Sequence, residues 1–105
     1  MRILFDQGTP APLRHALTPH TVETAYEKGW AALSNGDLLN AAENASFNLF
    51  ITTDQNLRYQ QNLAGRKLAI LVLPTTRWPA IEKHAADVLA AVNAITAGQY
   101  KELSW

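Results

Sequence analysis

The stretch Leu-Ala-Ile-Leu-Val-Leu-Pro at residues 68–74 decides the fold class of this 105-residue chain. Its first six residues are all apolar, and the run is too short for a typical helix, so it predicts a strand that is buried on both faces. Shorter apolar runs at residues 3–5 and within 48–52 predict two more buried strands, and weak alternation over residues 20–25 predicts another.

Helix signals lie between these strands. Thr9 followed by Pro10 predicts a short helix with Thr9 as its N-cap. The polar segment Ser-Asn-Gly-Asp at residues 34–37 predicts the start of a second helix. Trp78 begins a pattern of apolar residues at helical spacing that runs to about Gly98. Alternating strands and helices of this kind predict one domain over residues 1–105, a three-layer α/β/α sandwich with a mostly parallel sheet of four to five strands.

Composition excludes several classes of protein. Nine basic residues balance nine acidic ones and the pI is about 6.8, so any binding of nucleic acid must come from a local patch. The absence of cysteine excludes a disulfide scaffold and a thiolate zinc site. No apolar run reaches the length of a membrane span and the first residues do not resemble a signal peptide, so we expect a soluble cytoplasmic protein.

Three aspartates follow strands or open a helix at positions that favour one edge of the sheet. Asp6 comes directly after the first strand, Asp54 follows the third, and Asp37 opens the helix that leads to the third strand. Ligands of parallel α/β sheets bind outside the carboxyl ends of the strands, where these acids are expected to meet. Such a cluster predicts a site for Mg²⁺ or Mn²⁺, although each aspartate taken alone is more typical of a turn or a helix start than of a metal site.

The same residues resemble the PIN-like domain superfamily, in particular its short single-domain members. The resemblance covers about residues 1–75 and rests on Phe-Asp at residues 5–6, Asp-Leu-Leu-Asn-Ala-Ala at 37–42 and Ile-Thr-Thr-Asp at 51–54. It implies a metal-dependent ribonuclease, or the toxin of a toxin–antitoxin pair, with RNA as substrate. Asp6, Asp37 and Asp54 would then be catalytic and metal-ligating, with the hydroxyl of Thr52 supporting them.

Two positions depart from the pattern of that family. Gln7 and Asn56 stand where the short PIN-like proteins usually have further acids. Amide carbonyls can still ligate a cation, but the site loses negative charge and is expected to hold the ion more weakly. This departure supports an alternative, a binding or interaction module that acts as a homodimer or with an antitoxin protein. In this alternative the tail, residues 99–105, would be an edge strand or an interface element, because its apolar residues Tyr100, Leu103 and Trp105 alternate with polar ones.

Three residues near the acids are candidates for contact with RNA. Arg14 follows Asp6, and Arg58 with Tyr59 follows Asp54, so that the two cations could meet phosphates and the tyrosine could stack on a base. At zero net charge, the favoured interpretation is that both arginines are solvated cations on a helix face.

A third reading is a phospho-acceptor receiver domain with Asp54 as acceptor and Thr75 and Thr76 as its hydroxyl residues. Two features argue against it. The first strand ends in a single acid, and no fifth strand with a lysine is expected after the last helix.

Overall fold

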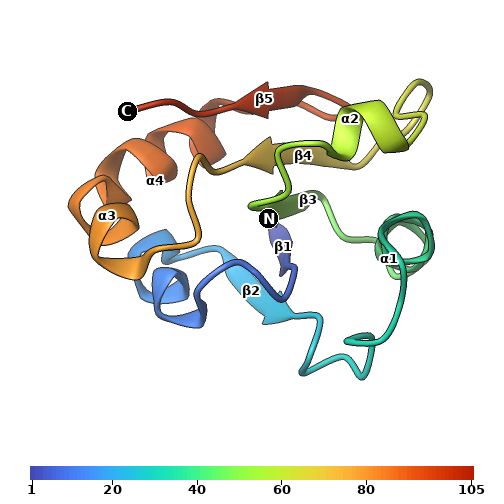
Figure 1. The fold of residues 1–105 in the computed structure, drawn as a ribbon, viewed down its shortest axis with the longest axis horizontal. Coiled ribbons are helices and arrows are strands. Elements are labelled where there is room, and N and C mark those ends of the chain that lie inside the picture. Colours follow the sequence, from blue (N-terminus) through green and yellow to red (C-terminus); the bar gives the residue numbers. More distant parts are fainter.

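The computed structural model describes all of residues 1–105 and contains one five-stranded sheet (Figure 1). The strands are β1 (Arg2–Phe5), β2 (Thr21–Thr24), β3 (Leu49–Thr52), β4 (Ala69–Val72) and β5 (Tyr100–Glu102). They lie in the order β2-β1-β3-β4-β5, and every neighbouring pair is parallel. The three strands expected from apolar runs and the one expected from alternation over residues 20–25 are therefore confirmed, and the tail forms the fifth strand.

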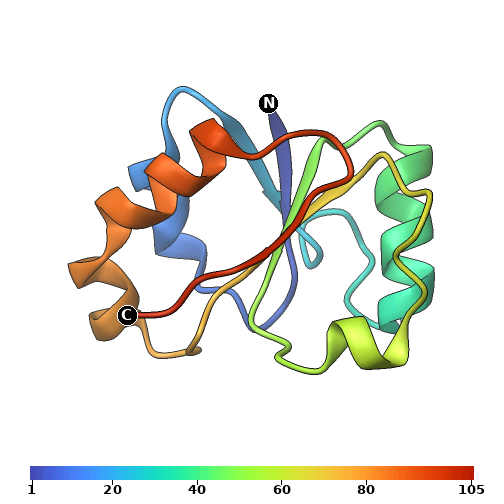
Figure 2. The same cartoon turned by 90° about the horizontal axis from the view of Figure 1, so that it is seen from above.

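Helices cover both faces of the sheet, as Figure 2 shows. The 3₁₀ helix η1 (Ala11–Leu17), α3 (Trp78–Lys83) and α4 (Ala85–Ala94) lie on one face. The helices α1 (Asn35–Asn44) and α2 (Leu57–Gln60) lie on the other. The predicted three-layer α/β/α sandwich is confirmed. None of these helices combines the length and the apolar character that crossing a membrane demands.

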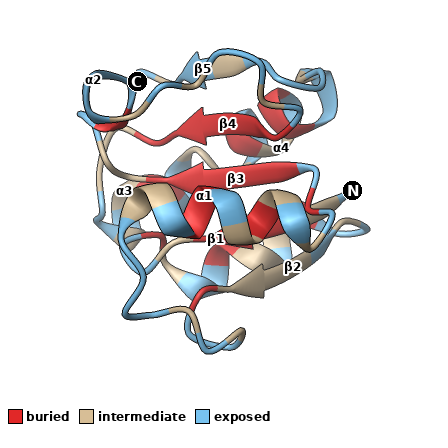
Figure 3. Ribbon diagram, turned by 90° about the vertical axis from the view of Figure 1, so that its right-hand side faces the viewer, coloured by how far each residue is buried: buried red, intermediate tan, exposed pale blue.

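Two core layers follow from the alternation of side chains along the strands. In β1, Ile3 and Phe5 pack toward η1, α3 and α4, whereas Leu4 packs toward α1 and α2. The central strands β3 and β4 are buried along their whole length, while the edge strands β2 and β5 are not (Figure 3). Burial on both faces explains why β3 and β4 are apolar without alternation.

Two helix predictions are wrong in detail. Thr9 does not cap a helix, because η1 begins after Pro10 and has no side-chain cap; the Thr9 hydroxyl turns inward instead. The helix expected from Trp78 to about Gly98 is two helices, separated at His84, whose φ of −112° and ψ of 18° depart from helical geometry. The apolar spacing continues across that break, so the sequence pattern did not reveal it.

The fifth strand removes one argument against the receiver reading. β5 pairs with β4 and carries Lys101, whereas the sequence predicted that no fifth strand with a lysine would follow the last helix. Its backbone is recruited because Ile70, Leu71 and Val72 present an unpaired strand edge to the tail. The other argument, a single acid after β1, still holds.

Candidate functional site

Asp6 and Asp54 are joined at the carboxyl edge of the sheet by one side chain, Thr52. Its hydroxyl donates a hydrogen bond to Asp6 Oδ2, and Thr52 Oγ1 accepts one from the backbone N–H of Asp54 at 3.0 Å. β1 and β3 are parallel neighbours, with Phe5 opposite Ile51, so the loops that follow them leave the sheet side by side. Thr52 is only 1% exposed, and its position is fixed by the buried end of β3.

The second oxygen of Asp6 organises the turn after β1. Asp6 Oδ1 accepts from the backbone N–H of Thr9 at 3.0 Å and lies 2.7 Å from the Thr9 hydroxyl. That hydroxyl also lies 3.0 Å from the carbonyl oxygen of Ile51, and because it has one proton it can donate to only one of the two. The turn lies close to β3, since a Cβ on Gly8 would collide with the Thr53 hydroxyl and that side chain would have to move.

Both oxygens of Asp54 are also engaged. Oδ1 accepts from the backbone N–H of Asn56 at 2.9 Å, and Oδ2 accepts from Asn35 Nδ2 at 2.7 Å. Asn35 is the first residue of α1, so this bond ties the start of that helix to the loop after β3. Asn35 was not predicted from the sequence, although its place beside the N-cap Ser34 was a signal that its side chain could face the carboxyl edge.

Asp37 lies in the first turn of α1, where the sequence placed it. Its side chain is exposed, and its backbone N–H donates to Ser34 Oγ at 3.3 Å. The structure contains no group of three or more histidine, aspartate or glutamate side chains arranged to hold a metal ion. The metal site of three carboxylates therefore stays a prediction; the contact through Thr52 joins the Asp6 carboxylate to the backbone of Asp54.

The two amides that replace acids are exposed. Gln7 Nε2 donates to the carbonyl oxygen of Ala31 at 3.1 Å, which leaves its own carbonyl oxygen free. Asn56 precedes α2, and its side chain does not cap that helix. Both amide oxygens are therefore available to a ligand.

The two arginines predicted to meet phosphate are bound to carboxylates of the chain itself. Arg14 donates to both oxygens of Glu27, at 2.5 and 3.2 Å. Arg58 Nη1 lies 3.0 Å from Glu102 Oε1, and its guanidinium lies over the ring of Tyr59. Hydrogen bonds from Arg14 and from the backbone of Thr24 lower the pKa of Glu27 to about 2. A phosphate would have to compete with these pairs.

Two other side chains at the same edge were not singled out from the sequence. Arg77 follows β4, is exposed and has no ion-pair partner. Tyr26 follows β2 and is 80% exposed. Tyr26 borders a shallow cavity of about 330 Å³ that also contacts Asp6 and Gln7. The positions of Arg77 and Tyr26 after strands could have placed both at the carboxyl edge from sequence alone, but neither residue belongs to a recognisable motif.

Comparison with known proteins adds no relative: no family model, curated protein or solved structure matches this chain.

Proposed function

We propose that this chain is a metal-dependent ribonuclease of the PIN-like type, in which Asp6 and Asp54 hold Mg²⁺ or Mn²⁺ at the carboxyl edge of the sheet. The observation that carries the proposal is the Thr52 hydroxyl, which bonds Asp6 and the backbone of Asp54 together. Two aspartates that follow adjacent parallel strands are thus held close together where ligands of such sheets bind, Asp6 through its carboxylate and Asp54 through its backbone N–H.

The chemistry of the donors fits a hard divalent cation. Carboxylates, the Thr52 hydroxyl and the free carbonyl oxygen of Gln7 supply oxygen only, which Mg²⁺ and Mn²⁺ prefer. Each carboxylate oxygen that already accepts one hydrogen bond keeps a second lone pair for a ligand. Asp37 is the third acid of the proposal, because α1 is tied to Asp54 through Asn35.

The bound ion would supply Lewis-acid stabilisation of the phosphate and a water of lowered pKa. The chain itself positions the substrate. Arg77 has no internal partner and is the cation that we assign to an RNA phosphate, whereas Arg14 and Arg58 stay in their ion pairs. Tyr26 and Tyr59, which are 80% and 72% exposed, offer flat surfaces to unpaired bases.

A specific observation favours a second candidate, an interaction module without catalysis. All four carboxylate oxygens of Asp6 and Asp54 already accept hydrogen bonds from the chain, so the edge is stable without an ion. Such a module would act as a homodimer or with an antitoxin-like protein.

Calorimetric titration with Mn²⁺ and Mg²⁺, together with RNA cleavage assayed on the same samples, tests the two candidates. For the wild type we expect metal binding and cleavage, and for Asp54→Asn the loss of both, because one direct ligand is replaced by a neutral amide. Asp87→Asn on α4 is the matched control and should behave as the wild type. Absence of metal binding by the wild type at millimolar cation would exclude the ribonuclease and leave the interaction module.

A further inference from the structure

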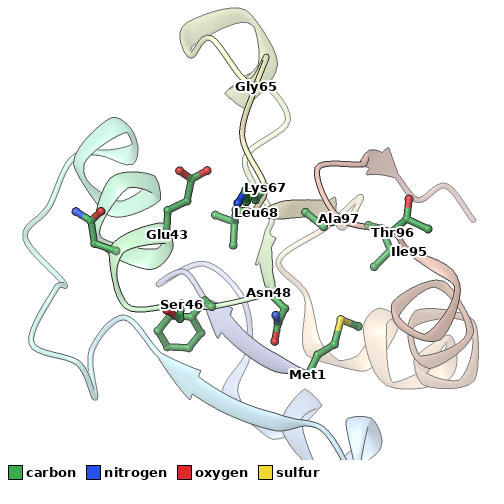
Figure 4. A pocket seen from close by; sticks show the side chains of 13 residues that line it. Met1, Glu43, Ser46, Asn48, Gly65, Lys67, Leu68, Ile95, Thr96 and Ala97 are labelled. Carbon is green, nitrogen blue, oxygen red and sulfur yellow. The ribbon is translucent and has the colours of Figure 1, made fainter.

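The amino edge of the sheet, opposite the candidate site, contains a cavity of about 700 Å³ (Figure 4). Three connections border it, those that lead from α1 to β3, from α2 to β4 and from α4 to β5. Its volume lies within the range of small-molecule sites, and nothing in the proposed nuclease chemistry uses it.

The floor of the cavity is apolar and belongs to the core. Phe47 and Leu68, which are 5% and 2% exposed, are part of the layer under α1 and α2. Ile95 packs against the opposite layer, so the floor extends across the end of the sheet from one layer to the other. An apolar group seated here would contact side chains that cannot move without disturbing the core.

Two side chains of opposite charge stand above this floor. Glu43 projects from α1, and Lys67 comes from the segment that enters β4, on the other side of the gap (Figure 4). Glu43 Oε1 is shielded from solvent and accepts no hydrogen bond; Arg66 Nη1, 3.5 Å away, is its nearest charged neighbour. Lys67 has no ion-pair partner in the chain. Glu43 is therefore ion-paired with Arg66 but lacks a hydrogen bond at Oε1, so a ligand cation would compete with Arg66, whereas Lys67 is unpaired.

The rim of the cavity is held in a conformation that L-residues rarely adopt. Ser46 has a φ of 65°, and backbone bonds from Ser46 to Glu43 and from Phe47 to Ala42 fix the turn around it. A non-glycine residue in this region costs free energy and persists where the surroundings determine it. The rim is thus preformed, and a ligand would not have to order it.

We propose that this cavity binds a free α-amino acid with a large apolar side chain. Its ammonium group donates to Glu43, its carboxylate meets Lys67, and its side chain lies on Phe47, Leu68 and Ile95. A purely anionic ligand would face the carboxylate of Glu43, and a purely cationic ligand would face the ammonium of Lys67, so the pair of charges favours a zwitterion. The inference does not depend on the ribonuclease proposal, because the two sites lie at opposite edges of the sheet.

Titration of the ¹⁵N-labelled full chain with L-phenylalanine, followed by NMR, tests the inference. We expect shifts of the amides around Ser46, Lys67 and Ile95, with saturation in the millimolar range. Two analogues separate the charges: 3-phenylpropionate lacks the amine and 2-phenylethylamine lacks the carboxylate. Each should bind about tenfold more weakly or worse, the loss typical of a charged hydrogen bond.

Variants of the cavity should reproduce these losses. Lys67→Met should weaken the binding of phenylalanine at least as much as removing the ligand's carboxylate does. Glu43→Gln should weaken it at least as much as removing the ligand's amine does. Lys101→Met and Glu82→Gln, exposed residues outside the cavity, are the matched controls. Ala97→Phe fills the cavity from its rim and should abolish binding in a protein whose NMR spectrum is otherwise unchanged.

Two results would overturn the inference. One is the absence of amide shifts at the amino edge with millimolar phenylalanine, and the other is equal affinity of the wild type and the Lys67→Met and Ala97→Phe variants. Loss of metal binding or of RNA cleavage in the experiment above would leave it unaffected.

Discussion

Thr52 is buried at the end of β3, and its hydroxyl both donates to Asp6 and accepts from the backbone of Asp54. A residue of the same shape without the hydroxyl would leave a partly buried carboxylate oxygen and a backbone N–H without these partners. The sequence suggested a supporting role for Thr52 from the Thr-x-Asp resemblance, but the bond across to Asp6 depends on the adjacency of β1 and β3.

Thr52→Val should therefore destabilise the protein although the side-chain volume hardly changes. We expect the free energy of unfolding to fall by about 1–3 kcal/mol, the range for leaving buried polar groups unsatisfied, as measured by urea denaturation. Thr52→Ser keeps the hydroxyl and should retain more of the stability. Equal stability of the Val variant and the wild type would contradict the proposed role of this hydroxyl.

Glu27 makes stability depend on pH through its bonds to Arg14 and Thr24. Because its pKa is lowered from 4.5 to about 2 in the folded protein, its ionised form stabilises the fold above its ordinary pKa. This contribution is lost as the pH falls from about 4.5 toward 2. We expect Glu27→Gln to lower the urea midpoint at pH 7, with a difference from wild type that shrinks below pH 4.5. An NMR titration that places the Glu27 carboxyl at its ordinary pKa would refute the assignment.

At the scale of elements, the turn between α4 and β5 shows how the tail is brought to the sheet. Gly98 has a φ of 75°, its N–H donates to the carbonyl oxygen of Lys67 at 2.8 Å, and a Cβ there would lie 2.7 Å from the carbonyl oxygen of Arg66. The turn thus lies directly on the segment that enters β4. The tail is also held at its end, where the Trp105 ring stacks on His84 with centroids 4.6 Å apart.

Gly98→Ala and Gly65→Ala form a matched pair that separates backbone strain from steric contact. Both glycines have a φ near 75°, but a Cβ at Gly65 would meet nothing within 4 Å. Gly65→Ala should cost about 1–2 kcal/mol, the penalty of the left-handed region for an L-residue. Gly98→Ala should cost distinctly more, because the Arg66 carbonyl must move as well. Urea denaturation measures both, and equal losses would show that the close contact is relieved without cost.

At the scale of the whole molecule, the parallel sheet separates two edges of different chemistry. The carboxyl edge carries Asp6 and Asp54 with Thr52 between them, whereas the amino edge carries the cavity beside Glu43 and Lys67. Formal charges cancel over the chain, and five of the nine basic side chains form ion pairs with carboxylates of the chain. The basic side chains without an ion-pair partner are Lys67, Arg77, Lys83 and Lys101, of which Arg77 lies at the carboxyl edge and Lys67 at the amino edge.

The amino-acid sequence by itself determined the class of fold and the carboxyl edge as the place of the acids. A run such as residues 68–73 can bury its apolar side chains only between two layers of helices, and strands that alternate with helices pair in parallel. Since a side chain that follows a parallel strand must emerge at its carboxyl end, Asp6 and Asp54 were placed before any contact was known.

Only the tertiary structure decided which groups meet. The pairing of β1 with β3 brings Thr52 to Asp6, the packing of α1 brings Asn35 to Asp54, and β5 forms because β4 offers an open edge. Likewise Arg58 is paired with Glu102, 44 positions further along the chain, which no local pattern could indicate. The physical reason is that hydrogen bonds and ion pairs between distant residues depend on strand order and helix docking. Apolar periodicity, in contrast, depends only on residues that are close together in the sequence.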